Sequence, residues 1–223
     1  MQLDWSVIPQ NFVFFMGGLM WTLIVSVVSI SLGFLGGLLI GMARISNNKA
    51  IYYPATAYVE AFRGTPLLIQ IFLIFFGLPS LGIQFDPLTA GILALSLNSA
   101  AYQAEIFRGG VQSISKGQME AARAMGLTNN QALAYVIIPQ ALRNALPAYT
   151  NEFITMIKDS SLVMIIGVYE LTMRGKIVIA ETFQPFVVYI FIAVVYFVLT
   201  YTTSRILRQV ERKTAIPGMM GVD

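Results

Sequence analysis

The sequence FVFFMGGLMWTLIVSVVSISLGFLGGLLIGMA, residues 12–43, is the stretch that decides the fold. It contains no charged side chain over its whole length. A helix needs about 20 apolar residues to cross the hydrocarbon core of a bilayer, so this run can cross with tilt or with a protruding end. The preceding MQLDW has an acid where a cleavable signal peptide has basic residues. We therefore expect a retained membrane-spanning helix here.

Composition extends this expectation to the whole chain. Hydrophobic residues make up 57% of the 223 residues and charged residues only 11%, which is typical of an integral membrane protein. The chain has no Cys and no His, so nothing favours a disulfide framework, a thiolate metal site or histidine-based catalysis. We expect no catalytic residue and no metal site, and no nucleic-acid partner, because topology explains the net charge of +3 better.

Further apolar runs predict an all-α, polytopic membrane protein with about five transmembrane helices, forming a single domain over residues 1–223. The second run is interrupted by Gly64, Thr65 and Pro66, which are typical helix breakers. In the first run, Gly33, Gly37 and Gly41 form a small-residue stripe, for which packing within the chain is favoured over a dimer interface. The predicted spans are residues 12–43, 51–77, 88–107, 145–169 and 186–204.

Basic residues predict the orientation of the chain. Ten Lys and Arg residues fall after the first span, after the third span and in the tail, whereas two, Arg174 and Lys176, fall on the opposite side. Because Lys and Arg concentrate in cytoplasmic loops, the N-terminus is expected outside and the C-terminus in the cytoplasm. The long polar loop 108–144 would then face the cytoplasm.

This loop has the pattern of two short capped helices. Ser115 with Gln118, and Thr128 with Gln131, match the capping box, in which a hydroxyl residue is followed three positions later by Glu or Gln. Gly126 between them suits the left-handed residue that ends a helix. The alanines and methionines of this hairpin would give another protein a compact surface to contact.

The hairpin carries the sequence EAARAMGLTNNQALAYVIIP, residues 120–139, which resembles the EAA signature of permease subunits of bacterial and archaeal ABC importers. The resemblance continues in EAFRGTPLLIQIFLIFFGLP (60–79), AYQAEIFRGGVQSI (101–114) and NEFITMIKDSSLV (151–163), which look like the polar amino acid branch, the histidine, glutamine and arginine permeases. In that family the hairpin is a coupling helix that docks on a cytoplasmic ATPase. The resemblance therefore implies that the docking residues here are Glu120, Ala121, Ala122, Arg123, Met125, Gly126 and Leu127.

The family also implies the partners. These are two copies of a cytoplasmic ATP-binding subunit, a second permease subunit that is the same chain or a similar one, and an external solute-binding protein. They would work in the cell membrane of a bacterium or archaeon, among its lipids. The chain has no G-x4-G-K-[ST] phosphate loop, so we expect no cofactor and no ATPase site in it, with ATP and Mg²⁺ on the partner.

Polar residues inside the spans indicate the translocation pathway, because an acid at a helix centre costs about 2.5–3.5 kcal/mol on the insertion scale. Glu152 and Asp159 are two turns apart and share a face, while Asn98, Tyr102 and Glu105 form a second stripe. A break after Asp159 would suit a binding site at a discontinuous helix. The predicted substrate-binding residues are Asn98, Glu152, Asp159, Ser160, Gln70 and Thr65.

These residues favour a polar amino acid as the substrate. A carboxylate would bind the ammonium group, and amide and hydroxyl groups would bind the carboxylate. Two acids exceed what one ammonium requires, which suggests a basic amino acid.

Other interpretations remain open. A gradient-driven secondary carrier would use Glu152 or Asp159 for its coupling ion, and a membrane scaffold would explain the hairpin but not these acids. Nearer the cytoplasmic face, Glu60 with Arg63 and Glu105 with Arg108 are expected to form structural i,i+3 ion pairs.

Overall fold

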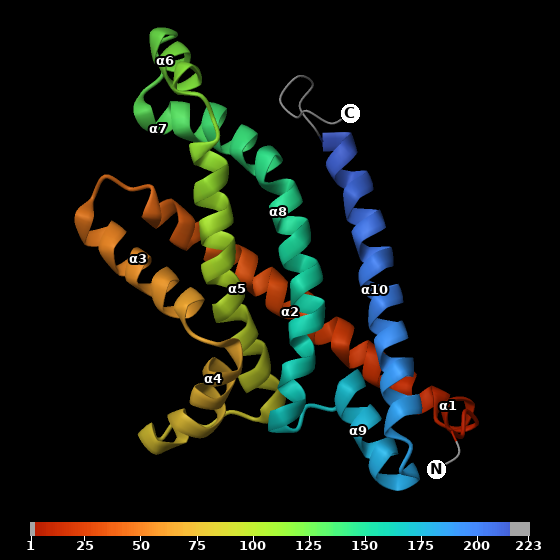
Figure 1. Ribbon diagram of the computed structural model, residues 1–223. Coiled ribbons are helices and arrows are strands. Elements are labelled where there is room, and N and C mark those ends of the chain that lie inside the picture. The colour runs from red at the N-terminus through yellow and green to blue at the C-terminus, as the bar shows by residue number, and fades with distance from the viewer. Residues whose placement is uncertain (1–2, 215–223) are drawn as a thin grey trace.

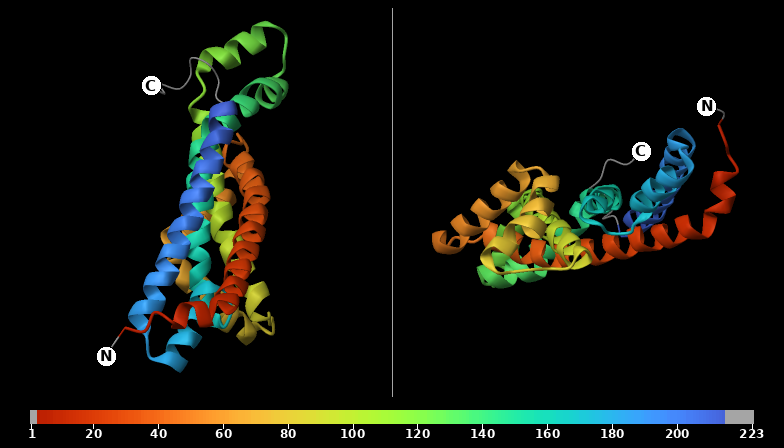
Figure 2. Two further views of the ribbon diagram at one scale, coloured as in Figure 1. Left: turned by 90° about the vertical axis from the view of Figure 1, so that its right-hand side faces the viewer. Right: turned by 90° about the horizontal axis from the view of Figure 1, so that it is seen from below.

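The computed structural model describes residues 3–214, and within them the protein is built from helices without strands (Figures 1 and 2). An all-α membrane fold was predicted and is confirmed. The predicted cytoplasmic C-terminus lies outside the described residues. The elements are α1 (Val7–Gln10), α2 (Phe12–Arg44), α3 (Lys49–Gly64), α4 (Leu67–Phe72), the π-helix η1 (Leu73–Gly77), the 3-10 helix η2 (Leu78–Leu81), α5 (Pro87–Gln112), α6 (Lys116–Ala124), α7 (Asn129–Ala132), the π-helix η3 (Leu133–Ile137), α8 (Ile138–Asp159), the 3-10 helix η4 (Ser160–Ile166), α9 (Leu171–Thr182) and α10 (Pro185–Thr214).

Glycines bring α2 against α5. A Cβ added to Gly33, Gly37 or Gly41 would lie 2.7–2.8 Å from atoms of α5, closer than real Cβ atoms approach. The missing side chains let the two backbones pack closely, as small residues do in membrane bundles. The packing of this stripe within the chain is therefore confirmed.

The second predicted span, 51–77, is not one straight helix. Gly64 ends α3, Thr65 is extended, with φ −118° and ψ 144°, and the helical path resumes after Pro66 at an angle of 106°. Proline pushes the residue before it out of the helical region, which explains the break. Figure 1 shows α3 and α4 diverging on one side of the bundle.

The fourth predicted span, 145–169, also differs from its helix. α8 begins earlier, at Ile138, and ends at Asp159, where the chain tightens into η4. The predicted break after Asp159 is wrong, because Asp159 and Ser160 keep helical dihedral angles and α8 continues directly into η4. The Ser160 hydroxyl donates to the Ile157 carbonyl at 2.8 Å.

Both short helices of the loop between α5 and α8 form (Figure 2). Gly126 has φ +91°, and the N–H groups of Gly126 and Leu127 bond the carbonyls of Arg123 and Ala122, the two bonds of a Schellman motif. The capping box of Thr128 and Gln131 is confirmed. The one predicted at Ser115 is wrong, because its side chain makes no capping bond.

An ion cluster ties α2, α3 and α5 together at the hairpin end of the bundle. Glu105 is bound closely by Arg44 and Arg108, and Arg63 lies 3.8 Å away. Glu60 pairs with Arg44 at 3.7 Å. The pair of Glu105 with Arg108 was predicted correctly, whereas Arg63 was wrongly assigned to Glu60.

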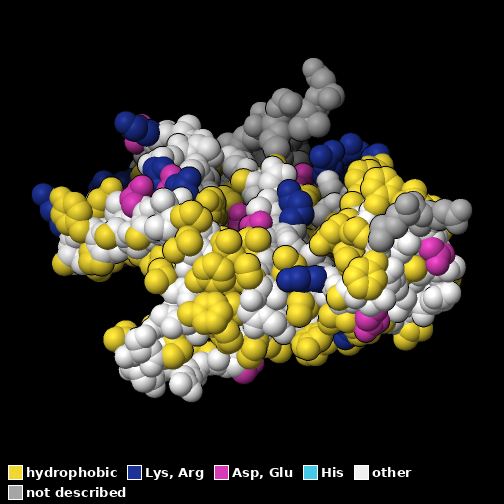
Figure 3. Space-filling model, turned by 60° about the horizontal axis from the view of Figure 1, so that its bottom comes forward, with side chains coloured by type: hydrophobic (Ala, Val, Ile, Leu, Met, Phe, Trp, Pro, Cys, Tyr) yellow, Lys and Arg dark blue, Asp and Glu magenta, His cyan; other side chains and the backbone are white. Residues whose placement is uncertain are grey.

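Apolar side chains cover much of the face seen in Figure 3. By length and hydropathy, α2 and α10 qualify as membrane spans among residues 3–214, and α3 with Leu67–Leu81 adds a third if counted as one broken span. α5 and α8 have 26 and 22 residues, enough length to cross, but they carry polar residues. The total of five spans stays a prediction.

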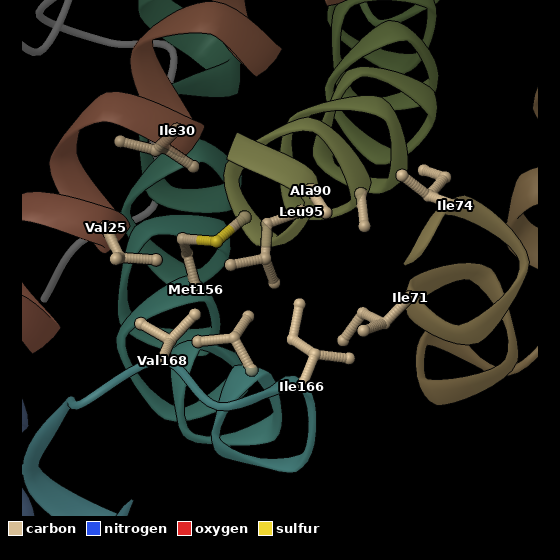
Figure 4. Packing of buried hydrophobic residues seen from close by; sticks show 11 residues of the cluster. Val25, Ile30, Ile71, Ile74, Ala90, Leu95, Met156, Ile166 and Val168 are labelled. Carbon is tan, nitrogen blue, oxygen red and sulfur yellow. The ribbon is translucent and has the colours of Figure 1, made fainter. Parts of the chain in front are cut away.

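The main core cluster lies beside the break (Figure 4). Val25 and Ile30 of α2 and Leu95 of α5 pack with Met156 of α8 and Ile71 of α4. Because α4, α5 and α8 share this core, it fixes the helices that line the polar cavity described next.

Candidate functional site

A polar cavity of about 420 Å³ lies where the break between α3 and α4 faces α5 and α8. Figure 3 shows the surface hollowed on its left, between the lobe that carries α3 and the lobe that carries α4. The lining residues are Arg63, Gly64, Thr65, Pro66, Leu67, Asn98, Tyr102, Glu152, Thr155 and Asp159.

α8 contributes two carboxylates to the cavity. Seven residues at 1.5 Å each separate Glu152 and Asp159 by about 10 Å along the helix axis, so they face different depths of the same cavity. Asp159 has no hydrogen bond or ion pair within residues 3–214. The neighbouring Lys158 interacts with it electrostatically but forms no ion pair, so the carboxylate is available to bind a cation.

Glu152 is held by a chain of hydrogen bonds. Its Oε1 accepts from the Ser99 hydroxyl at 2.8 Å. The Gln103 amide donates to Ser99 Oγ at 2.9 Å and to the carbonyl of Ile30 on α2 at 3.2 Å. Ser99 and Gln103 are both buried, so the chain fixes the position of the carboxylate from behind the cavity wall.

α5 contributes Asn98 and Tyr102, which lie one turn apart and line the cavity. Glu105, the third residue of the predicted stripe, is bound by arginines in the ion cluster and lies outside the lining. The stripe therefore divides into a cavity-facing part and a structural part.

Arg63 is the charged lining residue that the sequence reasoning did not assign to the site; the other lining residues outside the prediction are Gly64, Pro66, Leu67, Tyr102 and Thr155. It lies over the Tyr102 ring, 5.4 Å from its centroid, and is more loosely placed against Glu105 than Arg44 and Arg108 are. The i,i+3 spacing to Glu60 favoured a structural pair. The signal that could have found Arg63 was its position directly before the helix breaker at Gly64, where a helix end opens toward a cavity.

Four of the predicted substrate-binding residues, Thr65, Asn98, Glu152 and Asp159, therefore come together in one cavity. Gln70 and Ser160 are buried outside its lining, with 5% and 0% of their surfaces exposed. Gln70 bonds the backbone at the break and Asn98, while Ser160 bonds the backbone of α8.

The predicted docking residues lie on the hairpin, away from the cavity. Met125 is 86% exposed, and Glu120, Ala121 and Arg123 are also exposed. Ala122 is instead buried, so it supports the hairpin from inside and is not part of its surface. The hairpin connects α5 directly to α8, the two helices that hold Asn98 and Glu152.

A membrane bundle with an internal polar cavity and a rigid hairpin outside it has the architecture of a transport permease. Within residues 3–214 no group of three or more Asp and Glu residues could hold a metal ion. The chain belongs to the family of binding-protein-dependent transport system inner membrane components, which matches residues 33–216.

Similar proteins agree with this assignment. The chain is 41% identical to the glutamine transport system permease protein GlnP of Escherichia coli, over 97% of this chain and 100% of that protein. It is 39% identical to the arginine transport system permease protein ArtQ of Bacillus subtilis, over 96% and 98%. The crystal structure of an amino acid ABC transporter with histidines superimposes with a TM-score of 0.91 at 44% identity, covering 96% of this chain and 100% of that one.

Proposed function

We propose that this chain is the transmembrane subunit of an ATP-driven amino acid importer and that its polar cavity holds the amino acid during translocation. Family membership and the relatives named for glutamine and arginine transport support amino acid import. The single observation that carries the assignment of the site is the cavity where Glu152, Asp159 and Asn98 meet the broken end of α3.

The lining groups match the charges of an amino acid. Glu152 and Asp159 offer carboxylates to the α-ammonium group and to a cationic side chain. Arg63, which Glu105 holds only loosely, offers a guanidinium to the α-carboxylate, and guanidinium–carboxylate bonds are among the stronger hydrogen bonds in proteins. Asn98 and the hydroxyls of Thr65 and Thr155 complete the polar lining. This charge balance favours a basic amino acid over a neutral one.

Energy would reach the cavity through the hairpin. The Schellman motif at Gly126 and the capping box at Thr128 make the hairpin rigid. An ATPase docked on Glu120, Arg123, Met125 and Leu127 would therefore move α5 and α8 together, and with them Asn98 and Glu152. Such rigid-body motion between two states is sufficient for alternating access.

The proposal includes the partners and the orientation. Two copies of the ATPase would bind and hydrolyse ATP with Mg²⁺, because this chain has no phosphate loop of the Walker type. A second permease subunit would complete the pathway, and an external binding protein would deliver the amino acid. The hairpin would lie in the cytoplasm and the N-terminus outside, as the basic residues indicate.

Uptake into proteoliposomes tests the proposal. The purified chain alone should transport no amino acid, whereas the complex with ATPase, ATP and binding protein should. Transport by the chain alone, driven by an ion gradient, would favour the secondary carrier and contradict the importer.

Substitution of the acids tests the site. Bonds to charged groups contribute about 1.5–3 kcal/mol, so Glu152→Gln or Asp159→Asn should weaken uptake of a basic amino acid by roughly 10–100-fold and that of a neutral one less. Glu181→Gln, at an exposed acid of α9, is the matched control and should leave uptake unchanged. Equal losses for basic and neutral substrates would contradict the assignment.

A further inference from the structure

Gln70 of α4 is a buried amide whose two ends bind different parts of the site. Its Nε2 donates to the Phe62 carbonyl at 2.7 Å, to the Thr65 carbonyl at 3.1 Å and to Thr65 Oγ1 at 2.9 Å. Its Oε1 accepts from Asn98 Nδ2 at 3.0 Å. One side chain therefore connects the end of α3, the start of α4 and the cavity wall on α5.

Proline chemistry explains why an amide is needed there. In an uninterrupted helix the Phe62 carbonyl would accept from the N–H of residue 66, but residue 66 is proline and has none. The bond lies in a part-buried setting, and a carbonyl that is shielded from water and lacks a donor is costly. The Gln70 amide supplies the missing donor at the shortest of its distances, 2.7 Å.

The same amide orients Asn98. Because Asn98 Nδ2 donates to Gln70, the carbonyl Oδ1 is the end of the Asn98 side chain that is left for the cavity. A carbonyl oxygen accepts hydrogen bonds and does not donate them, so Asn98 presents an acceptor suited to an ammonium group.

We propose that Gln70 is a positioning residue of the translocation site. It fixes the angle at which α4 leaves α3 and sets which end of the Asn98 amide meets the substrate, without touching the substrate itself. The inference rests on the proposed function, and it replaces the sequence-based prediction that Gln70 contacts the amino acid.

Uptake kinetics of the complete transporter test the positioning role. Gln70→Met keeps the length and volume of the side chain but removes every hydrogen bond. We expect its KM for the amino acid to rise about tenfold, the effect of about 1.4 kcal/mol, with kcat within about twofold of the unchanged protein. Thr22→Val is the matched control, because Thr22 is equally buried in a hydrogen-bonded network far from the cavity, and its KM should not change.

A pH profile separates this role from general loss of stability. In Gln70→Glu the protonated acid can donate one bond to the Phe62 carbonyl and still accept from Asn98, whereas the ionised form only accepts and repels the carbonyls. Its KM should therefore fall toward that of the unchanged protein as the pH is lowered and the acid becomes protonated, when each is compared at the same pH. Gln70→Met should show no such recovery. If the Met variant fails to assemble, the Glu variant still gives the comparison within one folded protein.

Cysteine labelling separates positioning from direct contact. The chain contains no cysteine, so Gln70→Cys and Thr155→Cys each give a unique thiol in a transporter with cysteine-free partners. Thr155→Cys should react with a small thiol reagent and be protected by substrate, while Gln70→Cys should not react. Three outcomes would overturn the proposal. They are substrate-sensitive labelling of Gln70→Cys, an unchanged KM in Gln70→Met, and the same pH profile in Gln70→Met and Gln70→Glu. Failure of the proposed function would be visible earlier, as absent uptake by the unchanged complex.

Discussion

Two neighbouring glycines at the end of α5 give opposite predictions for the same substitution. A Cβ added to Gly110 would lie 2.7 Å from the Ala141 carbonyl oxygen and 3.0 Å from the Ala145 Cβ, both on α8. A Cβ added to Gly109 would meet nothing within 4 Å. Gly110→Ala therefore tests the packing of α5 on α8 directly below the hairpin, and Gly109→Ala is its control.

The magnitude follows from these distances. Optimal contacts of carbon atoms lie near 3.5 Å, so α5 and α8 would have to separate by about 0.8 Å, and the obstacle is backbone, which cannot rotate away. Overpacking of this kind destabilises the folded protein by about 1–3 kcal/mol, while replacing a helical glycine by alanine stabilises it by about 0.5–1 kcal/mol. Gly110→Ala should therefore be net destabilising by up to about 2 kcal/mol, and Gly109→Ala stabilising by up to about 1 kcal/mol.

Thermal unfolding of the complex in detergent measures the difference. The two variants differ by the overpacking cost of about 1–3 kcal/mol, so at about 2–4 °C per kcal/mol for a chain of this size the two midpoints should differ by roughly 2–12 °C, with Gly110→Ala the lower. Hydrolysis of ATP should also become less dependent on substrate in Gly110→Ala, because the hairpin would no longer move α5 and α8 as one unit. A Gly110→Ala protein as stable as Gly109→Ala would refute the packing argument.

Three further predictions concern single residues. Gly126→Val should lose ATPase binding and uptake while still inserting into the membrane, because a β-branched residue resists the φ of +91° found there. Gly117→Ala is the control and should keep both, and normal uptake by Gly126→Val would contradict docking through the hairpin. Arg44→Leu should lower the unfolding midpoint more than Arg63→Leu, because Arg44 is buried against Glu105 and breaking a buried pair costs about 3–5 kcal/mol; equal shifts would count against the cluster. Hydrogen bonds from Thr89 and from the N–H of Leu88 lower the pKa of Asp86, so its cap on α5 should be present above the ordinary aspartate pKa and be lost as the pH falls through the lower pKa of the folded state. The loss should appear as faster hydrogen exchange of the Thr89 amide at acid pH. Asp86→Asn, which caps at any pH, should not show this increase.

Local chemistry accounts for the parts of the structure that the sequence predicted well. The left-handed Gly126 and the capping box at Thr128 depend only on neighbouring residues, and both are present. The Gly64-Thr65-Pro66 break was also visible in the sequence. Its angle of 106° was not, because the direction of α4 depends on non-local contacts, namely the hydrogen bond of Gln70 with Asn98 and the packing of Ile71 in the core cluster shared with α5 and η4.

Non-local contacts explain the errors. Arg63 was paired with Glu60 by helical spacing, but α5 brings Glu105 within reach of Arg63, and α2 brings Arg44 to Glu60. Gln70 was assigned to the substrate because it is a polar residue in an apolar run. In the fold its amide instead bonds the Phe62 carbonyl at the break and the side chain of Asn98. The proline shows in the sequence that the Phe62 carbonyl lacks a donor, but only the folded chain shows that Gln70 lies close enough to supply one.

The hydrogen-bonded chain behind Glu152 has a consequence for how substrate preference can evolve. Ser99 supports this carboxylate, and a Cβ at Gly33 of α2 would lie 2.8 Å from the Cβ of Ser99. A side chain added at Gly33 would therefore displace the Ser99 hydroxyl and shift the Glu152 carboxylate, which we propose binds the amino acid, although Gly33 itself does not line the cavity. Related transporters can therefore differ in substrate preference through substitutions at positions that do not line the cavity, while the residues that line the cavity stay the same.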